Sequence, residues 1–397
     1  MRSASGFWRP LTRAACIASL LVGLSSACTS DYLIWIPRSP DADPFYRFVQ
    51  NDKVGYIDQH GKVAIPAVLG KFAGNSGGEF HSGLLENGGS NGVYVDSNGK
   101  KVLDRGLYRG WDFSEGLAVA MEKGDDRWGY INTRGEFAIP PRFETYPKGY
   151  VWPFVEGFAK IDVRGRIGYI VHAGDFAIAP RFLDGDAFHD GMARVIVEGP
   201  CAYNRIPEES SCPDFGVVPK DAPSSPALPT CKYTFADTSG KIISEQRFGY
   251  ARHFAEGLAP VQIGELWGYI DKRGDTAVAP RFESAAPFAD GLARVSRDGL
   301  TGYITHSGRY AITPRFKYAE DFADGRAVVG DGDSSYWYID HSGRKAIPET
   351  FELASPFFKG LAHVKLKSPD LEEEPLWQGT FAYITPDGKR VFTYRRD

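Results

Sequence analysis

The sequence predicts an all-β protein, a tandem array of about nine three-stranded units stacked as an open, solenoid-like structure, with propeller-like closure as the alternative. Three observations support this prediction. A short aromatic run recurs nine times, a glycine and a proline follow most copies in the same order, and almost no stretch has helical periodicity. A fixed period of 20–50 residues is typical of repeat architectures.

The recurring run is clearest in the segment Trp267-Gly-Tyr-Ile-Asp271. Its central aromatic residues, from Tyr56 to Tyr383, lie 34 to 39 residues apart, except for two gaps of 66 and 45 residues that indicate insertions. The five best copies place the repeat-defining residues at Gly55, Tyr56, Gly129, Tyr130, Gly168, Tyr169, Gly268, Tyr269, Gly302 and Tyr303.

Each unit is expected to contain three short strands and two tight turns. The run 267–271 alternates in the manner of a strand, and Gly268 allows a neighbouring ring or strand to approach closely. Residues 271–274 predict a hairpin turn, and the return strand 276–279 is expected to end at Pro280, which has no N–H for a ladder. A second turn at 289–291 leads to a third strand, 292–295.

A three-stranded unit cannot bury its apolar face alone, so neighbouring units must cover it. Three strands per unit fit the usual four-stranded propeller blade poorly, and this mismatch favours the open array over the closed one.

These landmarks resemble those of the WG β-repeat family, over roughly residues 53 to 394. The resemblance depends on the order of several landmarks, because the Trp-Gly pair itself survives only at Trp128-Gly129 and Trp267-Gly268. It implies a bacterial interaction or scaffold module with no shared chemistry.

The N-terminus predicts export. Residues 1–27 combine three arginines with a short apolar run that is too short to span a bilayer. The run ends in Leu24-Ser-Ser-Ala-Cys28, which resembles the lipobox of bacterial lipoproteins, so Cys28 is the expected lipidation site. An ordinary secretory signal is the alternative. Residues 28–46 are then a tether, and 47–397 hold the array.

The predicted location is the cell envelope, where the lipid anchors the protein to a membrane. The outer membrane is favoured because no Asp follows Cys28, and a secreted or periplasmic soluble protein is the alternative. Removal of residues 1–27 leaves 43 Lys+Arg against 50 Asp+Glu, a formal charge of −7. A mildly acidic surface argues against nucleic acid as a partner.

Two insertions, 199–231 and 367–378, interrupt the array. The first is rich in Pro and Ser and predicts a loop. A disulfide between Cys201 and Cys231 would close the base of this loop, and Cys201–Cys212 is the rival pairing. The cysteine spacings match no zinc pattern. The second insertion predicts a solvated loop, with a binding tip at Trp377 as the alternative.

We identify no catalytic residue, metal site or cofactor site from the sequence. Histidines and acids recur at turn positions, whereas a catalytic group should be singular. The Gly-x-Ser-x-Gly matches around Ser76 and Ser90 lack the strand-turn-helix context of a nucleophile elbow.

The resulting hypothesis is a non-enzymatic binding or scaffold lipoprotein of the cell envelope, presenting its repeat surface to a protein or polysaccharide. A structural spacer in the envelope is the alternative. A glycan-active enzyme with its site at loop 199–231 is the third hypothesis.

Overall fold

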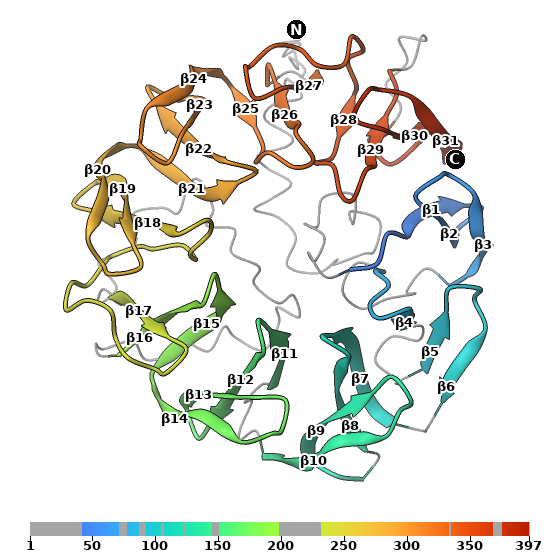
Figure 1. Ribbon diagram of the computed structural model, residues 1–397. Helices are drawn as coiled ribbons and strands as arrows, with labels where there is room; N and C mark the ends of the chain where they lie inside the picture. Colours follow the sequence, from blue (N-terminus) through green and yellow to red (C-terminus); the bar gives the residue numbers. More distant parts are fainter. Residues whose placement is uncertain are drawn as a thin grey trace, which may run out of the picture.

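The chain forms nine small antiparallel sheets, which we call blades 1 to 9 in chain order. The computed structural model describes residues 42–70, 78–86, 93–104, 107–122, 124–144, 151–197, 232–332, 335–367 and 375–396. All regular elements in these ranges are strands. Figure 1 shows the nine blades arranged as a closed ring around a central axis, with β1 and β31 side by side.

The strands of the first half of the ring are distributed as follows. Blade 1 holds β1 (Tyr46–Gln50), β2 (Lys53–Ile57) and β3 (Val63–Leu69), and blade 2 holds β4 (Leu84–Glu86), β5 (Val93–Asp96) and β6 (Lys101–Asp104). Blade 3 holds β7 (Leu107–Ser114), β8 (Leu117–Glu122), β9 (Arg127–Asn132) and β10 (Phe137–Glu144). Blade 4 holds β11 (Val151–Val155), β12 (Phe158–Val163), β13 (Arg166–Ile170) and β14 (Phe176–Phe182).

The second half continues the same pattern. Blade 5 holds β15 (Asp184–His189), β16 (Met192–Ile196) and β17 (Tyr233–Asp237), and blade 6 holds β18 (Leu258–Ile263), β19 (Leu266–Asp271) and β20 (Thr276–Phe282). Blade 7 holds β21 (Ser284–Ala289), β22 (Leu292–Arg297), β23 (Leu300–Ile304) and β24 (Tyr310–Phe316). Blade 8 holds β25 (Tyr318–Ala319), β26 (Ala327–Gly330) and β27 (Tyr336–Ile339), and blade 9 holds β28 (Leu353–Ala354), β29 (Ala362–Lys365), β30 (Gly379–Ile384) and β31 (Arg390–Arg396).

The predicted all-β array of nine units is confirmed, but the favoured open arrangement is wrong and the closed alternative is the one observed. The error began with the strand count. A complete blade has four strands, and the innermost of them, which is β21 in blade 7, was not predicted from the sequence. This strand contains Pro287, and its register shifts between Ala285 and Phe288, so its residues do not alternate regularly.

The prediction that Pro280 ends its strand is also wrong. β20 continues through Pro280 to Phe282, and its pairing with β19 shifts register between Trp267 and Tyr269. The proline is tolerated because β20 is the outer strand of its sheet, where a missing N–H breaks no ladder bond on the free edge.

The glycine of the repeat is required by this irregular pairing. A Cβ placed on Gly268 would lie 2.5 Å from the carbonyl oxygen of Val278, and one on Gly302 would lie 2.5 Å from that of Ile312. The neighbour that approaches closely is therefore the backbone of the outer strand. Gly129 and Gly168 meet the outer strands of their own blades in the same way.

Each blade shields the next, as the sequence predicted. One apolar cluster combines Tyr269 of blade 6 with Phe288 and Val295 of blade 7, and another combines Tyr303 of blade 7 with Phe322 and Val329 of blade 8. Burial of each such side chain contributes about 1.5–3 kcal/mol relative to exposure. The core is thus a ring of layers between blades.

Candidate functional surface

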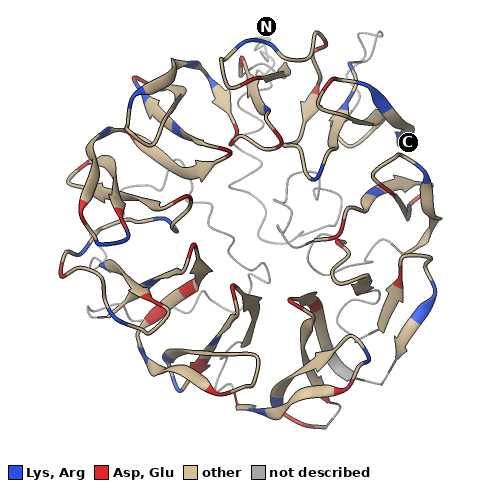
Figure 2. Cartoon of the chain, viewed as in Figure 1, with Lys and Arg blue, Asp and Glu red and all other residues tan. Residues whose placement is uncertain are grey.

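The turn between the inner and second strands gives each blade a tip near the centre of the ring. In eight blades the first turn residue has φ between 45° and 56° and the following glycine between 74° and 98°, as in a type I′ hairpin. Six of these residues are acidic, one is a serine and one is a lysine: Ser82, Glu115, Glu156, Asp190, Glu256, Asp290, Asp324 and Lys359. Figure 2 shows acidic residues at tips that point toward the centre.

Each of the six carboxylates accepts a hydrogen bond from the turn glycine of the following blade. Asp290 accepts from the amide of Gly325 at 2.6 Å, and Asp324 accepts from that of Gly360 at 2.7 Å. The same bond joins Glu115 to Gly157, Glu156 to Gly191, Asp190 to Gly257 and Glu256 to Gly291. The recurrent acids therefore tie one blade to the next, a function that sequence spacing alone did not indicate.

Three histidines complete these ties. His341 stacks on Phe322 of its own blade, and its Nε2 lies 3.6 Å from a carboxylate oxygen of Asp290 in the blade before. His172 and His306 repeat this arrangement with Glu115 and Glu256. The predicted structural role of these turn histidines agrees with their position as interblade ion-pair partners.

The tyrosine of the repeat forms a second tie. Its ring is buried, and its hydroxyl donates to a carbonyl oxygen in the next blade, as Tyr303 does to Glu320 at 2.6 Å. Among the predicted repeat-defining residues, Tyr56, Tyr130, Tyr169 and Tyr269 donate to Gly78, Trp152, Asp186 and Ala286, and Tyr94, Tyr338 and Tyr383 behave alike. Because the buried hydroxyl has a hydrogen-bond acceptor in the next blade, the position is more often Tyr than Phe.

The arginine of the Pro-Arg-Phe motif forms a third tie. Arg315 lies over the ring of Phe316, 5.0 Å from its centroid, and donates to the carbonyl of Gly343 in the next blade at 2.6 Å. Arg142, Arg181 and Arg281 make the same contacts with Gly174, Gly240 and Gly308. The motif therefore places a cation where it can cross between blades.

One position varies within this constant framework. Next to each tyrosine tie, a residue of the inner segment lies opposite a residue of the second strand, and we call these two a facing pair. The facing pairs of blades 3 to 9 are Trp111 with Val119, Trp152 with Lys160, Asp186 with Arg194, Arg252 with Pro260, Ala286 with Arg294, Glu320 with Val328, and Ser355 with His363.

The residue before each inner-segment member and the residue after each second-strand member are small or aliphatic and buried, for example Ala285 and Val295 in blade 7. The facing pairs themselves form different contacts. Lys160 lies 3.7 Å from the ring centroid of Trp152, whereas the Nε of Arg194 donates to Asp186 at 2.6 Å. We call the part of the blades that holds these pairs the inner wall of the ring. Its chemistry changes from blade to blade, and Val119, Pro260, Ala286 and Val328 are buried within it.

The remaining predicted site residues lie outside the described residues. These are the lipidation site Cys28 and the disulfide candidates Cys201, Cys212 and Cys231. The two serines rejected as nucleophiles, Ser76 and Ser90, also lie there. The two predicted insertions share one place in the blade. Insertion 199–231 follows β16 and insertion 367–378 follows β29, so both connect a second strand to a third, at the end opposite the acidic tips. The Trp377 side chain is 44% exposed.

No group of three or more His, Cys, Asp and Glu side chains in the described ranges could hold a metal ion. In the same part of the chain, no helix has the length and apolar character needed to cross a bilayer.

Comparison with known proteins identifies the repeat. The family described as WG containing repeat matches residues 128–166, 233–267, 267–300, 302–333 and 338–368. The first of these segments begins in β9 of blade 3 and ends at the start of β13 in blade 4, so the sequence repeat is offset from the structural blade.

Among solved structures, the chain is similar to one titled crystal structure of the eukaryotic initiation factor, with 11% identity, coverage of 89% of this chain and 96% of that one, and a TM-score of 0.53. This likeness concerns the fold alone. BamB from Moraxella catarrhalis (9% identity, 74% and 96% coverage, TM-score 0.35) and AztD from Citrobacter koseri (12% identity, 77% and 91% coverage, TM-score 0.39) are more distant. No curated protein matches the chain.

Proposed function

The chain is a WG-repeat protein folded as a closed ring, and from this premise we propose that it is a non-enzymatic binding or scaffold protein of the cell envelope. It presents the inner wall of the ring to a protein or polysaccharide partner. A lipid on Cys28 holds it on a membrane, with the outer membrane as the favoured location.

The observation that supports binding is the contrast between the ties and the facing pairs. The tyrosine, acid and arginine ties repeat from blade to blade with the same partners. The facing pairs carry aromatic, acidic, basic, hydroxyl and small side chains in turn. A uniform framework that displays varied side chains is the arrangement that recognition surfaces use, because the framework fixes positions while the side chains select the partner.

Blades 3 and 4 give this surface an aromatic sector. Trp111 and Trp152 are both partly exposed, and Lys160 lies over the Trp152 ring. Partly exposed tryptophans with a cation beside them suit a partner that offers flat apolar faces and polar groups together, which includes both sugar rings and protein side chains.

The spacer alternative receives less support from a ring. A spacer becomes longer with each repeat that is added. Repeats in a closed ring widen the ring and do not increase the distance that the protein spans. The enzyme alternative depends on loop 199–231, which lies outside the described residues.

A capture experiment tests the proposal. The lipid-free mature chain is immobilised and exposed to envelope protein extracts and to envelope polysaccharides, alongside a Trp111→Ala/Trp152→Ala double variant. We expect a partner that the double variant retains at least tenfold less well.

The matched control is Phe176→Ala, which removes an aromatic side chain that is 42% exposed on β14, an outer strand. It should capture the partner as well as the wild type does. Equal capture by all three proteins, or capture of nothing, would contradict binding at the inner wall. Fractionation of a Cys28→Ala variant tests the lipid separately, since the variant should leave the membrane fraction.

A further inference from the structure

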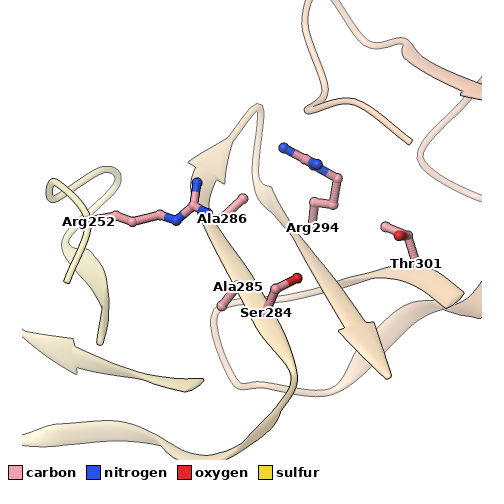
Figure 3. Close-up of a pocket in the computed structure, with 6 residues that line it drawn as sticks. All are labelled: Arg252, Ser284, Ala285, Ala286, Arg294 and Thr301. Atoms are coloured by element: carbon pink, nitrogen blue, oxygen red, sulfur yellow. The ribbon is translucent and has the colours of Figure 1, made fainter. Parts of the chain in front are cut away.

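A small pocket opens between blades 6 and 7. It is lined by Arg252, Ser284, Ala285, Ala286, Arg294 and Thr301, as Figure 3 shows. Its cavity volume is about 40 Å³. Arg252 belongs to blade 6, and the other five residues belong to blade 7.

The pocket exists because two facing-pair residues at this junction are short. At the two preceding junctions a long cation of the second strand crosses to the next blade: Lys160 donates to the carbonyl of Gly185, and Arg194 donates to that of Ala251. The equivalent residue in blade 6 is Pro260, which has no such side chain. Across from it, blade 7 presents Ala286, so the space remains open.

The two arginines beside this space differ in their partners. Arg294 is paired with Asp321 of blade 8, its Nε lying 2.9 Å from the carboxylate. Within the described part of the chain, Arg252 forms no hydrogen bond or ion pair through its guanidinium, which lies 5.6 Å from the centroid of the Trp267 ring. Burial, and then the charge of Arg294, lower the pKa of Arg252. The positive charge of Arg252 therefore has no carboxylate bonded to it among the described residues, although Asp321 also lies within electrostatic range.

From this geometry we propose that the pocket binds an oxyanion group, held by the guanidinium of Arg252 with the help of Arg294 and the hydroxyls of Ser284 and Thr301. Guanidinium groups bind carboxylate, sulfate and phosphate through paired N–H donors, and hydroxyls supply further donors. The Trp267 ring supports the face of Arg252 and leaves the edge of the guanidinium available.

The size of the pocket restricts the occupant. Sites for drug-sized molecules occupy about 300–1,000 Å³, so this pocket suits a single acidic group and not a whole ligand. The group can arrive as a free inorganic ion or as the substituent of a larger molecule, such as a uronic acid of a polysaccharide. The inference does not depend on the proposed envelope function.

The test is a titration of the full mature chain, labelled with ¹⁵N at arginine, with inorganic phosphate, sulfate and galacturonate at constant ionic strength. The side-chain Nε–Hε signals of Arg252 and Arg294 should shift as anion is added and should stop shifting before its concentration reaches ~50 mM. This limit is sufficient because a weak site has a dissociation constant of ~1 mM. A response to galacturonate alone would assign the group to an acidic sugar, and a response to phosphate or sulfate alone would assign it to an inorganic-type anion.

Two variants locate the site. Arg252→Gln removes the guanidinium and should weaken binding at least tenfold, while Ala286→Leu fills the pocket without changing charge and should weaken it similarly. Arg297→Gln is the matched control, because this β22 arginine has a side chain that is 57% exposed and should leave the affinity unchanged. Thermal melts confirm that each variant is folded.

The inference is overturned if no probe shifts the two arginine signals by ~50 mM, or if Arg252→Gln and Ala286→Leu bind as the wild type does. Equal weakening by Arg297→Gln would also overturn it, since the effect would then follow net charge.

Discussion

Two junctions between neighbouring blades are held together by different contacts: the one between blades 7 and 8, and the one between blades 9 and 1. The first uses all three ties: Tyr303 to Glu320, Asp290 to Gly325, and Arg315 to Gly343. The second keeps only the tyrosine tie, in which Tyr383 donates to the carbonyl of Arg47 at 2.6 Å. Lys359 stands where six other tips carry an acid, and its Nζ donates to the carbonyl of Ala42 at the start of blade 1.

Aromatic side chains replace the missing ties at the closing junction. Tyr46 and Phe48 occupy positions that hold Ala293 and Val295 in blade 7. The ring centroid of Phe48 lies 4.9 Å from that of Phe392 and 5.8 Å from that of Tyr394. The Tyr46 hydroxyl donates to the carbonyl of Phe358 in blade 9 at 2.9 Å. The larger side chains suit a blade to which the described residues contribute no inner strand. Interior junctions are therefore joined by repeated polar ties, whereas the closing junction combines an aromatic cluster with its own hydrogen bonds from Tyr46, Lys359 and Tyr383.

The largest expected effect comes from breaking this cluster. Phe48→Ala removes a side chain that is 3% exposed and contacts two aromatic rings of blade 9, so the free energy of unfolding should fall by about 3–5 kcal/mol. Denaturant unfolding followed by tryptophan fluorescence measures the change. Phe176→Ala, on an exposed outer-strand position, should stay within about 0.5 kcal/mol of the wild type. Equal losses for the two variants would show that the cluster does not hold the ring closed.

The second effect depends on pH and concerns the closing junction. His363 lies among Phe381, Tyr383 and Tyr394, and its Nε2 lies 2.9 Å from the Tyr394 hydroxyl. Burial, and then the positive charges of Arg396 and Arg47, lower the pKa of His363 to about 3. The unfolded chain has the ordinary histidine pKa of about 6.5. Because the unfolded state then binds a proton that the folded state does not, stability should be complete above about pH 6.5 and fall as the pH decreases toward 3.

The predicted slope is up to about 1.4 kcal/mol per pH unit for this one group. Unfolding midpoints measured between pH 7 and pH 5 test it against His363→Phe, which removes the titrating ring and should flatten the profile. Phe176→Ala, altered at an exposed side chain that does not titrate, should keep the wild-type slope. An unchanged slope in His363→Phe would contradict the assignment.

The sequence predicted the repeat far better than the closure, and the two junctions explain why. Gly268, Tyr269 and the Pro-Arg-Phe motif recur, so their periodicity is visible without coordinates. Closure depends on contacts of Tyr46 and Phe48, whose positions hold Ala293 and Val295 in blade 7, with residues such as Phe392 that lie more than 300 residues further along the chain. No periodic signal could bring them together.

The inner strand and the interblade ties were missed for related reasons. Segment 284–289 is interrupted by Pro287 and a register shift, so its sequence lacks the regular alternation that predicts a strand. The acids of the tips were correctly placed in turns, but their partners belong to the next blade. The 17-residue distance between Tyr303 and its acceptor Glu320 recurs at Tyr94, Tyr169, Tyr269 and Tyr338, and this spacing was the available signal.

A smaller effect sharpens the description of the regular junction. Tyr303→Phe keeps the buried ring and removes the hydroxyl that donates to Glu320, so the free energy of unfolding should fall by about 0.5–1.5 kcal/mol. Blade 5 already shows that the hydroxyl is dispensable for folding, because Phe235 is buried at the equivalent position. Tyr310→Phe is the control: its hydroxyl has no hydrogen-bond partner among the described residues, so its removal should cost no stability. A loss in Tyr310→Phe equal to that in Tyr303→Phe would mean that the measured change is not the interblade bond.

The smallest effect is expected at the acidic tips. Asp290→Asn keeps an acceptor for the amide of Gly325 and suits the positive φ of 53° at this position, but it removes the carboxylate charge that faces His341 at 3.6 Å. Both side chains are about 40% exposed, so solvent and salt screen the pair, and the loss should stay below about 1 kcal/mol. The loss should shrink further at high salt, which unfolding measurements in low and high sodium chloride would detect. Asp275→Asn, altered at a carboxylate that is 71% exposed, should show no comparable change. A salt-independent loss of several kcal/mol in Asp290→Asn would instead place the main strength of the regular junction in the tips, and the contrast between polar ties and a buried aromatic closure would then fail.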